Sequence, residues 1–184
     1  MAMLIQHNIL PPADMGGQSA RVLILCAPYY ADIAEMLVQG AQTECDLVGA
    51  AYERIDVPGA LEVPPAIQTA SRMADFDAYV ALGCIIRGET THYETVCNDS
   101  SRGLMDLGLR GLAIGNGILT VENYDQAMVR ANPMDQNKGG GAARAALHLL
   151  ALQRRFKSVP KGMGFRPRGE NILVAGNDDG SNIA

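Results

Sequence analysis

Several residue types that would direct the sequence toward other protein classes are scarce or missing. The 184 residues include no tryptophan, and aromatic residues make up only 5% of the chain. Basic residues are outnumbered, with 15 Lys and Arg against 20 Asp and Glu, which gives a formal net charge of -5. A surface that binds nucleic acid through its phosphates has to be basic, so we expect no nucleic-acid partner. Any anionic ligand must then be held by local groups.

Long hydrophobic runs are also missing. No apolar stretch reaches the roughly 18 residues that a membrane-spanning helix needs, and residues 1–17 lack the basic start and apolar core of a secretion signal. We therefore expect no membrane partner and a cytoplasmic location. The four cysteines, at positions 26, 45, 84 and 97, show no two-apart pairing of the kind that zinc sites use. They are expected to be reduced, and no metal site is predicted.

Strand-like apolar runs alternate with longer segments of helical spacing, which is typical of parallel β-α units covered on both faces. Hydrophobic residues make up 48% of the chain and charged residues 19%, as in an ordinary globular domain. The predicted strands are residues 21–27, a segment within 46–57, residues 78–86 and residues 111–121. The predicted helices are residues 31–42, a segment near 62–73, one that buries residues 96–107, and residues 123–130 and 138–156. The sequence therefore predicts an α/β fold with a four-stranded parallel sheet.

The last predicted helix carries two apolar stripes, which favour two burial partners. One stripe consists of residues 143, 146, 147 and 150, and the other of residues 149, 152 and 156. We expect the first to pack on the sheet of the same chain and the second on a neighbouring subunit.

Both ends of the chain differ in composition from the middle. We expect residues 1–19 to form an irregular N-terminal arm, which could lie along the sheet edge of a neighbour. Residues 20–157 are expected to form the single domain. Residues 158–184 mix Gly, Pro, Asn and Asp densely and are expected to be a flexible tail, although the stretch "NILVA" could pair as a short strand.

The segment "RGETTHYE", residues 87–94, comes directly behind the apolar run of the third strand, where an open parallel sheet binds its ligands. Gly88 lets the backbone approach a ligand closely, Thr90 or Thr91 can cap the next helix, and exposed N–H groups there attract an anion such as phosphate. His92 would stand in the first helical turn, where the macrodipole leaves a neutral ring able to accept protons near pH 7. The alternative is an exposed helix start with a histidine that has no chemical role.

Two further strand ends offer groups that could bind a ligand. Glu62, in "VPGALEVPP" (residues 57–65), could accept hydrogen bonds from ligand hydroxyls or could only favour a helix start. Tyr29 and Tyr30 follow the first strand, where an aromatic ring could stack on a flat heterocycle or pack at the rim of the core.

The fourth strand end and the segment after it offer an amide and two cations. Two glycines flank Asn116, which indicates a close contact, a bulge or a packing defect. Arg130 and Lys138 suit a phosphate ligand but could also be solvated charges at helix ends. Taken together, the strand ends predict a site for small molecules.

Four segments, "VPGALEVP", "ALGCIIRGETTHYETVCN", "GILTVEN" and "NKGGGAA", resemble the 6,7-dimethyl-8-ribityllumazine synthase family in order and spacing. The resemblance extends from about Arg21 to Phe156. It implies a flavodoxin-like three-layer sandwich with a four-stranded parallel sheet. It also implies a homo-oligomer with active sites between neighbouring subunits, a pentamer or a dimer of pentamers.

The activity implied by this resemblance belongs to riboflavin biosynthesis. The enzyme would condense 5-amino-6-(D-ribitylamino)uracil with 3,4-dihydroxy-2-butanone 4-phosphate to 6,7-dimethyl-8-ribityllumazine, releasing phosphate and water. The resemblance implies no metal and no organic cofactor.

The resemblance also implies roles for single residues. The implied catalytic residues are His92, for proton transfer, and Arg130, which would hold the phosphate from the adjacent subunit. The implied substrate-binding residues are Tyr29, Gly59, Ala60, Leu61, Glu62, Cys84, Ile85, Ile86, Gly88, Glu89, Thr90, Asn116 and Lys138. Among these, residues 88–90 would hold the phosphate with Lys138 nearby, residues 60–62 would line the ribityl chain, and residues 84–86 would line the pyrimidine, on which Tyr29 would stack.

Three features depart from the family pattern. Many members carry an aromatic residue in place of Asn116 and a small residue in place of Glu89, so the ring packing and the charge beside the phosphate differ here. The linker "ANPMDQ", residues 131–136, is unlike the Gly-rich linker of members that build sixty-subunit shells, which favours the smaller assemblies. An alternative function is a non-catalytic flavin- or lumazine-binding assembly on the same fold.

Overall fold

Four parallel strands form the centre of the molecule. The structure is a computed structural model and describes residues 10–157. The strands are β1 (Arg21–Ala27), β2 (Ala51–Asp56), β3 (Ala78–Ile86) and β4 (Ile114–Val121), in the spatial order β2-β1-β3-β4. All three pairings are parallel. This is the strand order of flavodoxin-like sheets, as expected from the resemblance.

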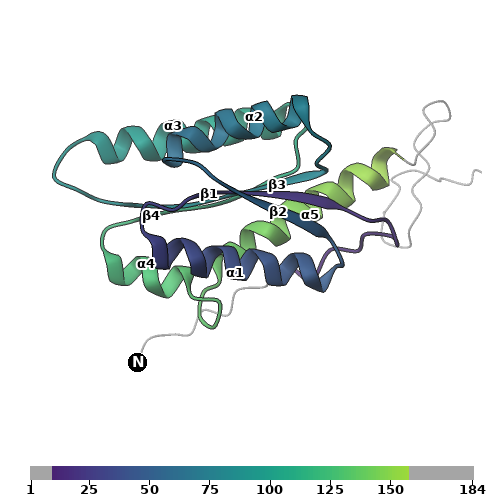
Figure 1. The fold of residues 1–184 in the computed structure, drawn as a ribbon, viewed down its shortest axis with the longest axis horizontal. Coiled ribbons are helices and arrows are strands. Elements are labelled where there is room, and N and C mark those ends of the chain that lie inside the picture. Colours follow the sequence, from purple (N-terminus) through teal and green to yellow (C-terminus); the bar gives the residue numbers. More distant parts are fainter. Residues whose placement is uncertain (1–9, 158–184) are drawn as a thin grey trace, which may run out of the picture.

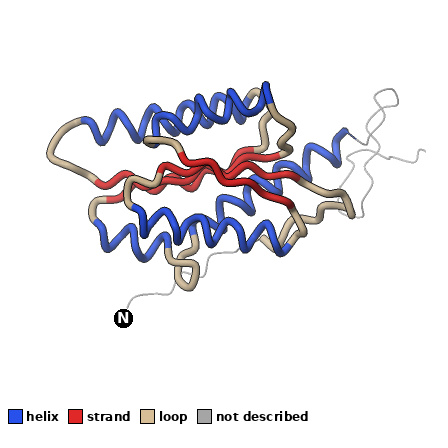
Figure 2. The backbone as a smooth tube through the Cα atoms, in the orientation of Figure 1, coloured by secondary structure: helices blue, strands red, loops and turns tan. Residues whose placement is uncertain are grey.

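Helices cover both faces of the sheet and complete a three-layer sandwich (Figures 1 and 2). One face carries α2 (Val63–Met73), preceded by the short 3-10 helix η1 (Ala60–Glu62), and α3 (His92–Leu109). The other face carries α1 (Ala31–Leu47), α4 (Tyr124–Ala131) and α5 (Lys138–Lys157). None of the helices within residues 10–157 is long and apolar enough to cross a membrane.

The strands are apolar without interruption because the sheet has a core on each face. Side chains alternate along β1, so that Val22, Ile24 and Cys26 join the core under α1 and α5. The residues between them, Leu23 and Leu25, join the core under α2 and α3. This double burial explains why the bounds predicted for β1 and β3 are those observed.

Two glycines let α5 approach its neighbours more closely than any side chain would permit. A Cβ atom on Gly115 of β4 would lie 1.8 Å from the carbonyl oxygen of Ala142 in α5. A Cβ atom on Gly139 would lie 2.0 Å from the carbonyl oxygen of Leu37 in α1. Backbone therefore touches backbone on both sides of α5, and the start of this helix, at Lys138, is fixed in place.

An ion pair between Glu44 and Arg144 joins α1 to α5. Glu44 is only 5% exposed, so the ion pair compensates the burial of its carboxylate. Residues 10–19, which form neither helix nor strand, lie against another face of α5. Arg144 donates to the carbonyl of Leu10, and Arg154 donates to the carbonyl of Ser19 at 2.8 Å.

Some element bounds differ from the prediction. The first helix continues to Leu47, five residues beyond the expected end at residue 42. The fourth strand begins at Ile114 instead of residue 111, because Gly111, with φ of 100°, turns the chain out of α3 first. The expected strand "NILVA" and most of the expected arm, residues 1–9, lie outside the described residues.

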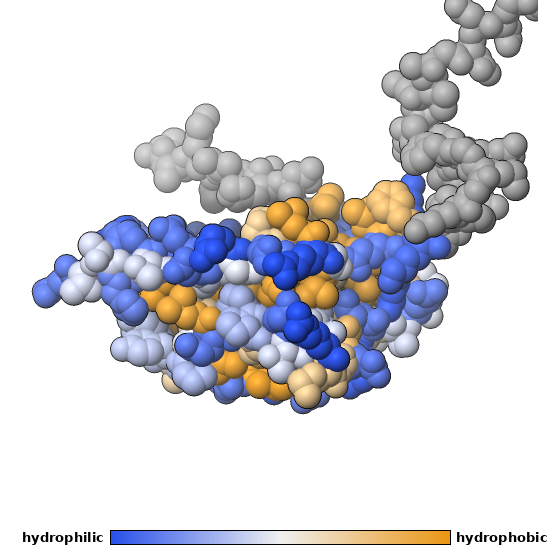
Figure 3. Space-filling view, turned by 90° about the horizontal axis from the view of Figure 1, so that it is seen from above, coloured by the Kyte–Doolittle hydropathy of each residue, from blue (hydrophilic) through white to orange (hydrophobic). Residues whose placement is uncertain are grey.

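The two stripes predicted for the last helix differ in burial as expected. Ala143, Ala146, Leu147 and Leu150 are buried against the sheet. The second stripe is exposed, with Leu149, Leu152 and Phe156 each more than two-fifths accessible. Hydrophobic patches interrupt the hydrophilic surface in the view from above (Figure 3). A neighbouring subunit as the partner of the second stripe remains a prediction.

The contact between Gly139 and α1 predicts a large loss of stability for Gly139→Ala. The added methyl group would force α1 and α5 apart, and we expect the free energy of unfolding to fall by about 3 kcal/mol. Gly108→Ala in α3 is the control, because a Cβ atom added there would have no described atom within 4 Å. It should stabilise the helix by about 0.5 kcal/mol. Urea unfolding followed by circular dichroism measures both, and equal midpoints would contradict the packing argument.

Candidate active site

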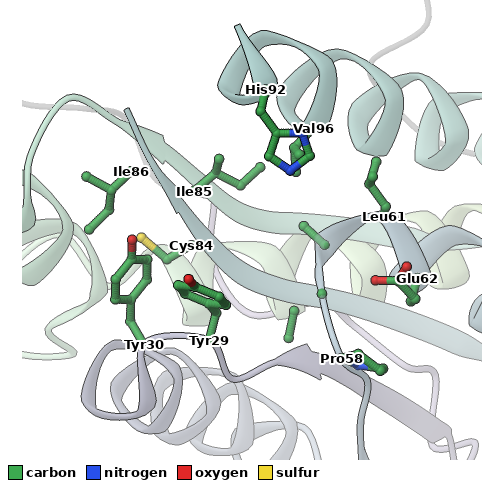
Figure 4. Close-up of a pocket in the computed structure, with 13 residues that line it drawn as sticks. Tyr29, Tyr30, Pro58, Leu61, Glu62, Cys84, Ile85, Ile86, His92 and Val96 are labelled. Carbon is green, nitrogen blue, oxygen red and sulfur yellow. The ribbon is translucent and has the colours of Figure 1, made fainter. Parts of the chain in front are cut away.

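A cavity of about 430 Å³ opens at the carboxyl ends of the strands, between β1 and β3. The helix after β1 crosses one face of the sheet and the helix after β3 crosses the other, so the chain parts here and leaves a crevice. Figure 4 shows its lining side chains. They come from the ends of β1 and β3, from the turn after β2 and from the start of α3, and they are Ala27, Tyr29, Tyr30, Pro58, Gly59, Ala60, Leu61, Glu62, Cys84, Ile85, Ile86, His92 and Val96.

Two tyrosines form the aromatic side of this cavity. Tyr29 is 76% exposed and meets Tyr30 edge to face, with ring centroids 5.0 Å apart. Tyr30 also meets Tyr124 of α4 edge to face, at 6.5 Å. Burial raises the pKa of the Tyr30 hydroxyl, and nearby Tyr29 and Cys84 raise it further, so this group stays neutral at physiological pH. Tyr29 therefore offers an open ring face, whereas Tyr30 is held from two sides.

The apolar side of the cavity is the end of β3, with Cys84, Ile85 and Ile86. Burial raises the pKa of the Cys84 thiol to about 11, with a smaller contribution from the negative charge of Asp32. At neutral pH the sulfur is therefore a thiol and a poor nucleophile. This wall can bind a flat apolar face, but it offers no covalent chemistry.

Glu62 places a carboxylate on the cavity wall. A Cβ atom on Gly59 would lie 2.8 Å from Glu62 Oε2, so the glycine leaves room for the carboxylate. Glu62 precedes α2 but its side chain makes no capping hydrogen bond. Because no cap bond occupies its oxygens, they remain able to accept from ligand hydroxyls. The charge of Glu62 also stands in the first turn of η1, so both interpretations that the sequence left open fit this position.

His92 is the first residue of α3, and its ring points toward the cavity (Figure 4). The prediction that a threonine caps this helix is wrong in one respect. Thr91 is the N-cap residue, but its side chain makes no capping hydrogen bond. The three residues before it, Gly88, Glu89 and Thr90, form an exposed turn that does not line the cavity.

Arg87, at the start of this turn, is the centre of a cluster of polar contacts. Its Nε donates to Glu122 at 2.7 Å, and its Nη1 donates to Glu94 at 2.5 Å. The guanidinium carbon lies 4.1 Å from the ring centroid of Tyr93. The hydrogen bond from Arg87 lowers the pKa of Glu94, so this carboxylate stays charged.

A second cavity, of about 440 Å³, lies along β4 and the start of α5 and shares no lining residue with the first. It brings together the remaining three candidate residues, Asn116, Arg130 and Lys138. Arg130 donates to the backbone carbonyl of Gln126 at 3.1 Å, and Asn116 accepts from the N–H of Ile118 at 3.0 Å. The other lining residues are Gly117, Ile118, Leu119, Thr120, Gly141, Ala142 and Ala145.

The glycines around Asn116 serve close packing. β4 pairs with β3 in continuous register from Ile114 to Val121, without a bulge. A Cβ atom on Gly117 would lie 2.7 Å from the side chain of Leu82 and 2.9 Å from Ala142. Of the alternatives that the sequence allowed, close contact with a neighbouring element is the one observed.

Three residues of the first cavity are not predicted from the sequence: Ala27, Pro58 and Val96. Val96 could have been found, because it follows His92 by four residues and so lies on the same face of α3. Ala27 and Pro58 line the cavity through the ends of their strands and carry no chemical signal of their own.

No group of three or more His, Cys, Asp or Glu side chains within residues 10–157 is arranged to hold a metal ion. All four cysteines are free thiols, three of them buried and Cys97 half-buried. The chemistry that the first cavity offers is therefore that of one imidazole, one carboxylate, a neutral thiol and an aromatic face.

Comparison with known proteins gives a consistent result. The family model for 6,7-dimethyl-8-ribityllumazine synthase matches residues 19–154. A protein of this name from Jannaschia sp. (strain CCS1) is 55% identical over 169 residues, which cover 91% of this chain and 93% of that protein. Proteins of the same name from Sphingopyxis alaskensis and Bartonella tribocorum are each 55% identical over 137 residues, covering 74% and 73% of this chain and 97% and 91% of theirs. The chain belongs to the 6,7-dimethyl-8-ribityllumazine synthase family.

Proposed function

We propose that residues 20–157 form the catalytic domain of a riboflavin-biosynthesis transferase. It condenses 5-amino-6-(D-ribitylamino)uracil with 3,4-dihydroxy-2-butanone 4-phosphate to 6,7-dimethyl-8-ribityllumazine. The observation that carries this proposal is the first cavity, which combines an open tyrosine ring, an apolar strand end, a carboxylate and an imidazole at one strand edge. Family membership over residues 19–154 supports the same reaction. A cytoplasmic location and the absence of cofactors remain predictions.

The aminouracil fits the wall between Tyr29 and the end of β3. Its flat ring would stack on the open face of Tyr29 and lie against Cys84, Ile85 and Ile86. Its ribityl hydroxyls would donate to Glu62. The turn before Glu62, residues 59–61, lines the same cavity. The neutral Cys84 thiol adds no charge beside the ring.

His92 would carry protons between the reacting groups. The amine of the aminouracil attacks the ketone carbonyl and water leaves as the imine forms, phosphate is then eliminated, and the ring closes with loss of further water. Each step moves a proton, and a positioned acid-base group contributes about 10² to 10⁴ in rate. Holding two substrates in register contributes more, up to the effective molarities of about 10⁵ to 10⁸ M seen in intramolecular reactions.

The phosphate would bind at the turn of residues 88–90, but this turn alone is a poor anion site. The positive charge of Arg87 is shared by Glu94 and Glu122, and Glu89 adds a further carboxylate. A bound phosphate therefore requires additional cations. Arg130 and Lys138 are suitable cations, and both line the second cavity.

We therefore infer that the complete site forms between two subunits, with the first cavity of one facing the second cavity of the next. The exposed second stripe of α5 and the exposed Met105 and Leu109 of α3 supply apolar surface for subunit contacts. By its family, the assembly would be a pentamer or a dimer of pentamers. A repeated head-to-tail contact of this kind closes into a ring when its rotation between neighbours is a whole fraction of a turn.

Mixing the protein with both substrates tests the proposed function directly. Lumazine absorbance and free phosphate should rise together, because condensation releases phosphate. A protein that only bound flavin or lumazine would change absorbance on binding but release no phosphate. No observation on the chain favours that second function.

His92→Ala should lower the rate of lumazine formation by about 10² to 10⁴, because proton transfer loses its carrier. The mass of the native assembly should not change, since His92 is exposed and makes no described hydrogen bond. His148→Ala is the matched control, because this histidine lies on α5, lines neither of the two cavities and has its described hydrogen bond to the carbonyl of Pro11. Wild-type turnover in His92→Ala would show that His92 does not carry the protons of this reaction.

Arg130→Ala should chiefly raise the KM for the butanone phosphate, by about tenfold or more, because one charge-assisted contact is lost. The KM for the aminouracil should stay within twofold. Arg102→Ala removes a cation of an exposed pair on α3 and serves as the control. Steady-state kinetics with each substrate varied in turn measures both constants, and an unchanged KM for the phosphate substrate would contradict the assignment.

Co-expression of His92→Ala and Arg130→Ala subunits tests the site between subunits. In randomly mixed rings, about a quarter of the seams would pair an intact His92 with an intact Arg130 from the neighbour. We expect the mixed assembly to recover roughly that share of wild-type activity at low phosphate substrate. Activity no greater than the average of the two pure variants would show that each site uses residues of one subunit only.

A further inference from the structure

The turn of residues 87–92, which contains the proposed phosphate site and His92, is weakly stabilised by its own residues. Residues 87–92 are all exposed, and α3 begins there without a side-chain cap on Thr91. An uncapped helix start leaves backbone N–H groups without partners and frays readily. A catalytic imidazole, however, must be held in place for proton transfer. Some contact from outside the helix has to fix this turn.

Arg87 makes that contact on three sides. Its backbone N–H donates to the carbonyl of Val121 at 2.9 Å, which extends the pairing of β3 with β4 by one step. Its guanidinium lies over the ring of Tyr93 and binds the carboxylate of Glu94. Tyr93 and Glu94 are the two residues directly after His92. Arg87 therefore holds the first turn of α3 through its contacts with the Tyr93 ring and the Glu94 carboxylate.

The same guanidinium is linked to the helix that carries Arg130. Arg87 Nε binds Glu122 at 2.7 Å, and the backbone N–H of Glu122 donates to the side chain of Gln126 at 3.1 Å. The carbonyl of Gln126 in turn accepts from Arg130 Nη1 at 3.1 Å. Gln126 is also fixed by Asn123, which accepts from its backbone N–H at 2.9 Å. An unbroken series of polar contacts therefore runs from Arg87 to Arg130.

We propose that Arg87 is a positioning residue that holds His92 and Arg130 of one subunit in a fixed relation without touching substrate. The inference rests on the proposed function, in which these two residues serve two neighbouring sites of the ring. Arg87 would then align His92 for one of these sites directly. It would align Arg130 for the neighbouring site through Glu122 and Gln126. Its planar guanidinium suits this role, because only a fork can bind two carboxylates while lying flat on an aromatic ring.

The geometry distinguishes this role from that of a phosphate ligand. The carboxylates of Glu94 and Glu122 both lie in short contact with the guanidinium and compete with a phosphate for its charge. If Arg87 were a ligand, removal of Glu122 would release it and strengthen binding of the phosphate substrate. If Arg87 positions the turn, removal of Glu122 weakens catalysis. The two roles predict opposite effects of the same substitution.

The test compares the steady-state kinetics of the assembled Arg87→Gln, Glu122→Ala and the double variant with those of the wild-type protein. We expect kcat to fall roughly tenfold in each single variant, since small misplacements of catalytic groups cost up to about 10² in rate. The KM for the butanone phosphate should rise, and the KM for the aminouracil should stay within twofold. The double variant should be no slower than the slower single variant, because both break the same contact.

Arg110→Gln is the matched control, because Arg110 also lies at an end of α3 and pairs with a carboxylate, Asp106, at 2.7 Å. It should have wild-type constants. If Arg87→Gln fails to assemble, Arg87→Lys replaces it, since lysine keeps the charge but cannot make all three contacts. Its kcat should then lie below that of the wild type.

Three results would overturn the inference. They are constants of Arg87→Gln equal to those of Arg110→Gln, a lowered KM for the phosphate substrate in Glu122→Ala, and strictly additive losses in the double variant. A wild-type protein that forms no lumazine would instead contradict the proposed function. The two failures are therefore separable in one set of measurements.

Discussion

The parallel pairing of β1 with β3 is the constraint on which the candidate site depends. Their register, from Val22 with Ala78 to Ala27 with Gly83, places both carboxyl ends at the same edge of the sheet. From that edge the chain leaves through α1 on one face and through α3 on the other. Tyr29 and the residues 84–86 are thus brought together although more than fifty positions separate them. The hydrogen bonds of the sheet impose this proximity, so it does not depend on the conformation of the loops.

Much of this arrangement could be predicted from the sequence because the signals are local. Strands buried on two faces appear as continuous apolar runs, so the predicted bounds of β1 and β3 agree with the structure to the residue. The polar segments behind the strands do supply cavity walls, at Tyr29, Glu62 and His92. The candidate residues fall into two cavities, and only the family resemblance implied such a division. Spacing along the chain does not show which of the two cavities a side chain lines.

Other features depend on tertiary contacts that sequence patterns do not show. The segment "RGETTHYE" predicted a threonine cap, whereas the helix start is held by Arg87, and one of its partners, Glu122, is 35 residues away. The glycines at 115 and 139 mark close approaches of α5 to β4 and α1. The sequence offered a close contact at Gly115 as one of three alternatives, but it did not indicate which element makes that contact. Lys138 owes its placement to these backbone contacts, so the second cavity depends on packing as much as on charge.

The way residues 10–19 are attached bears on how this part of the chain can evolve. Arg144, His148 and Arg154 of α5 bind this segment through the carbonyl oxygens of Leu10, Pro11 and Ser19. Every amino acid supplies a carbonyl, so such recognition reads the path of the backbone and is indifferent to most side chains. Mutational drift can therefore accumulate at the exposed positions of this segment while its course across the helix is inherited unchanged, provided that the three α5 donors persist. Ala13 and Met15 are excepted, because their side chains are buried in the core, and so are Gly16 and Gly17, whose φ is positive.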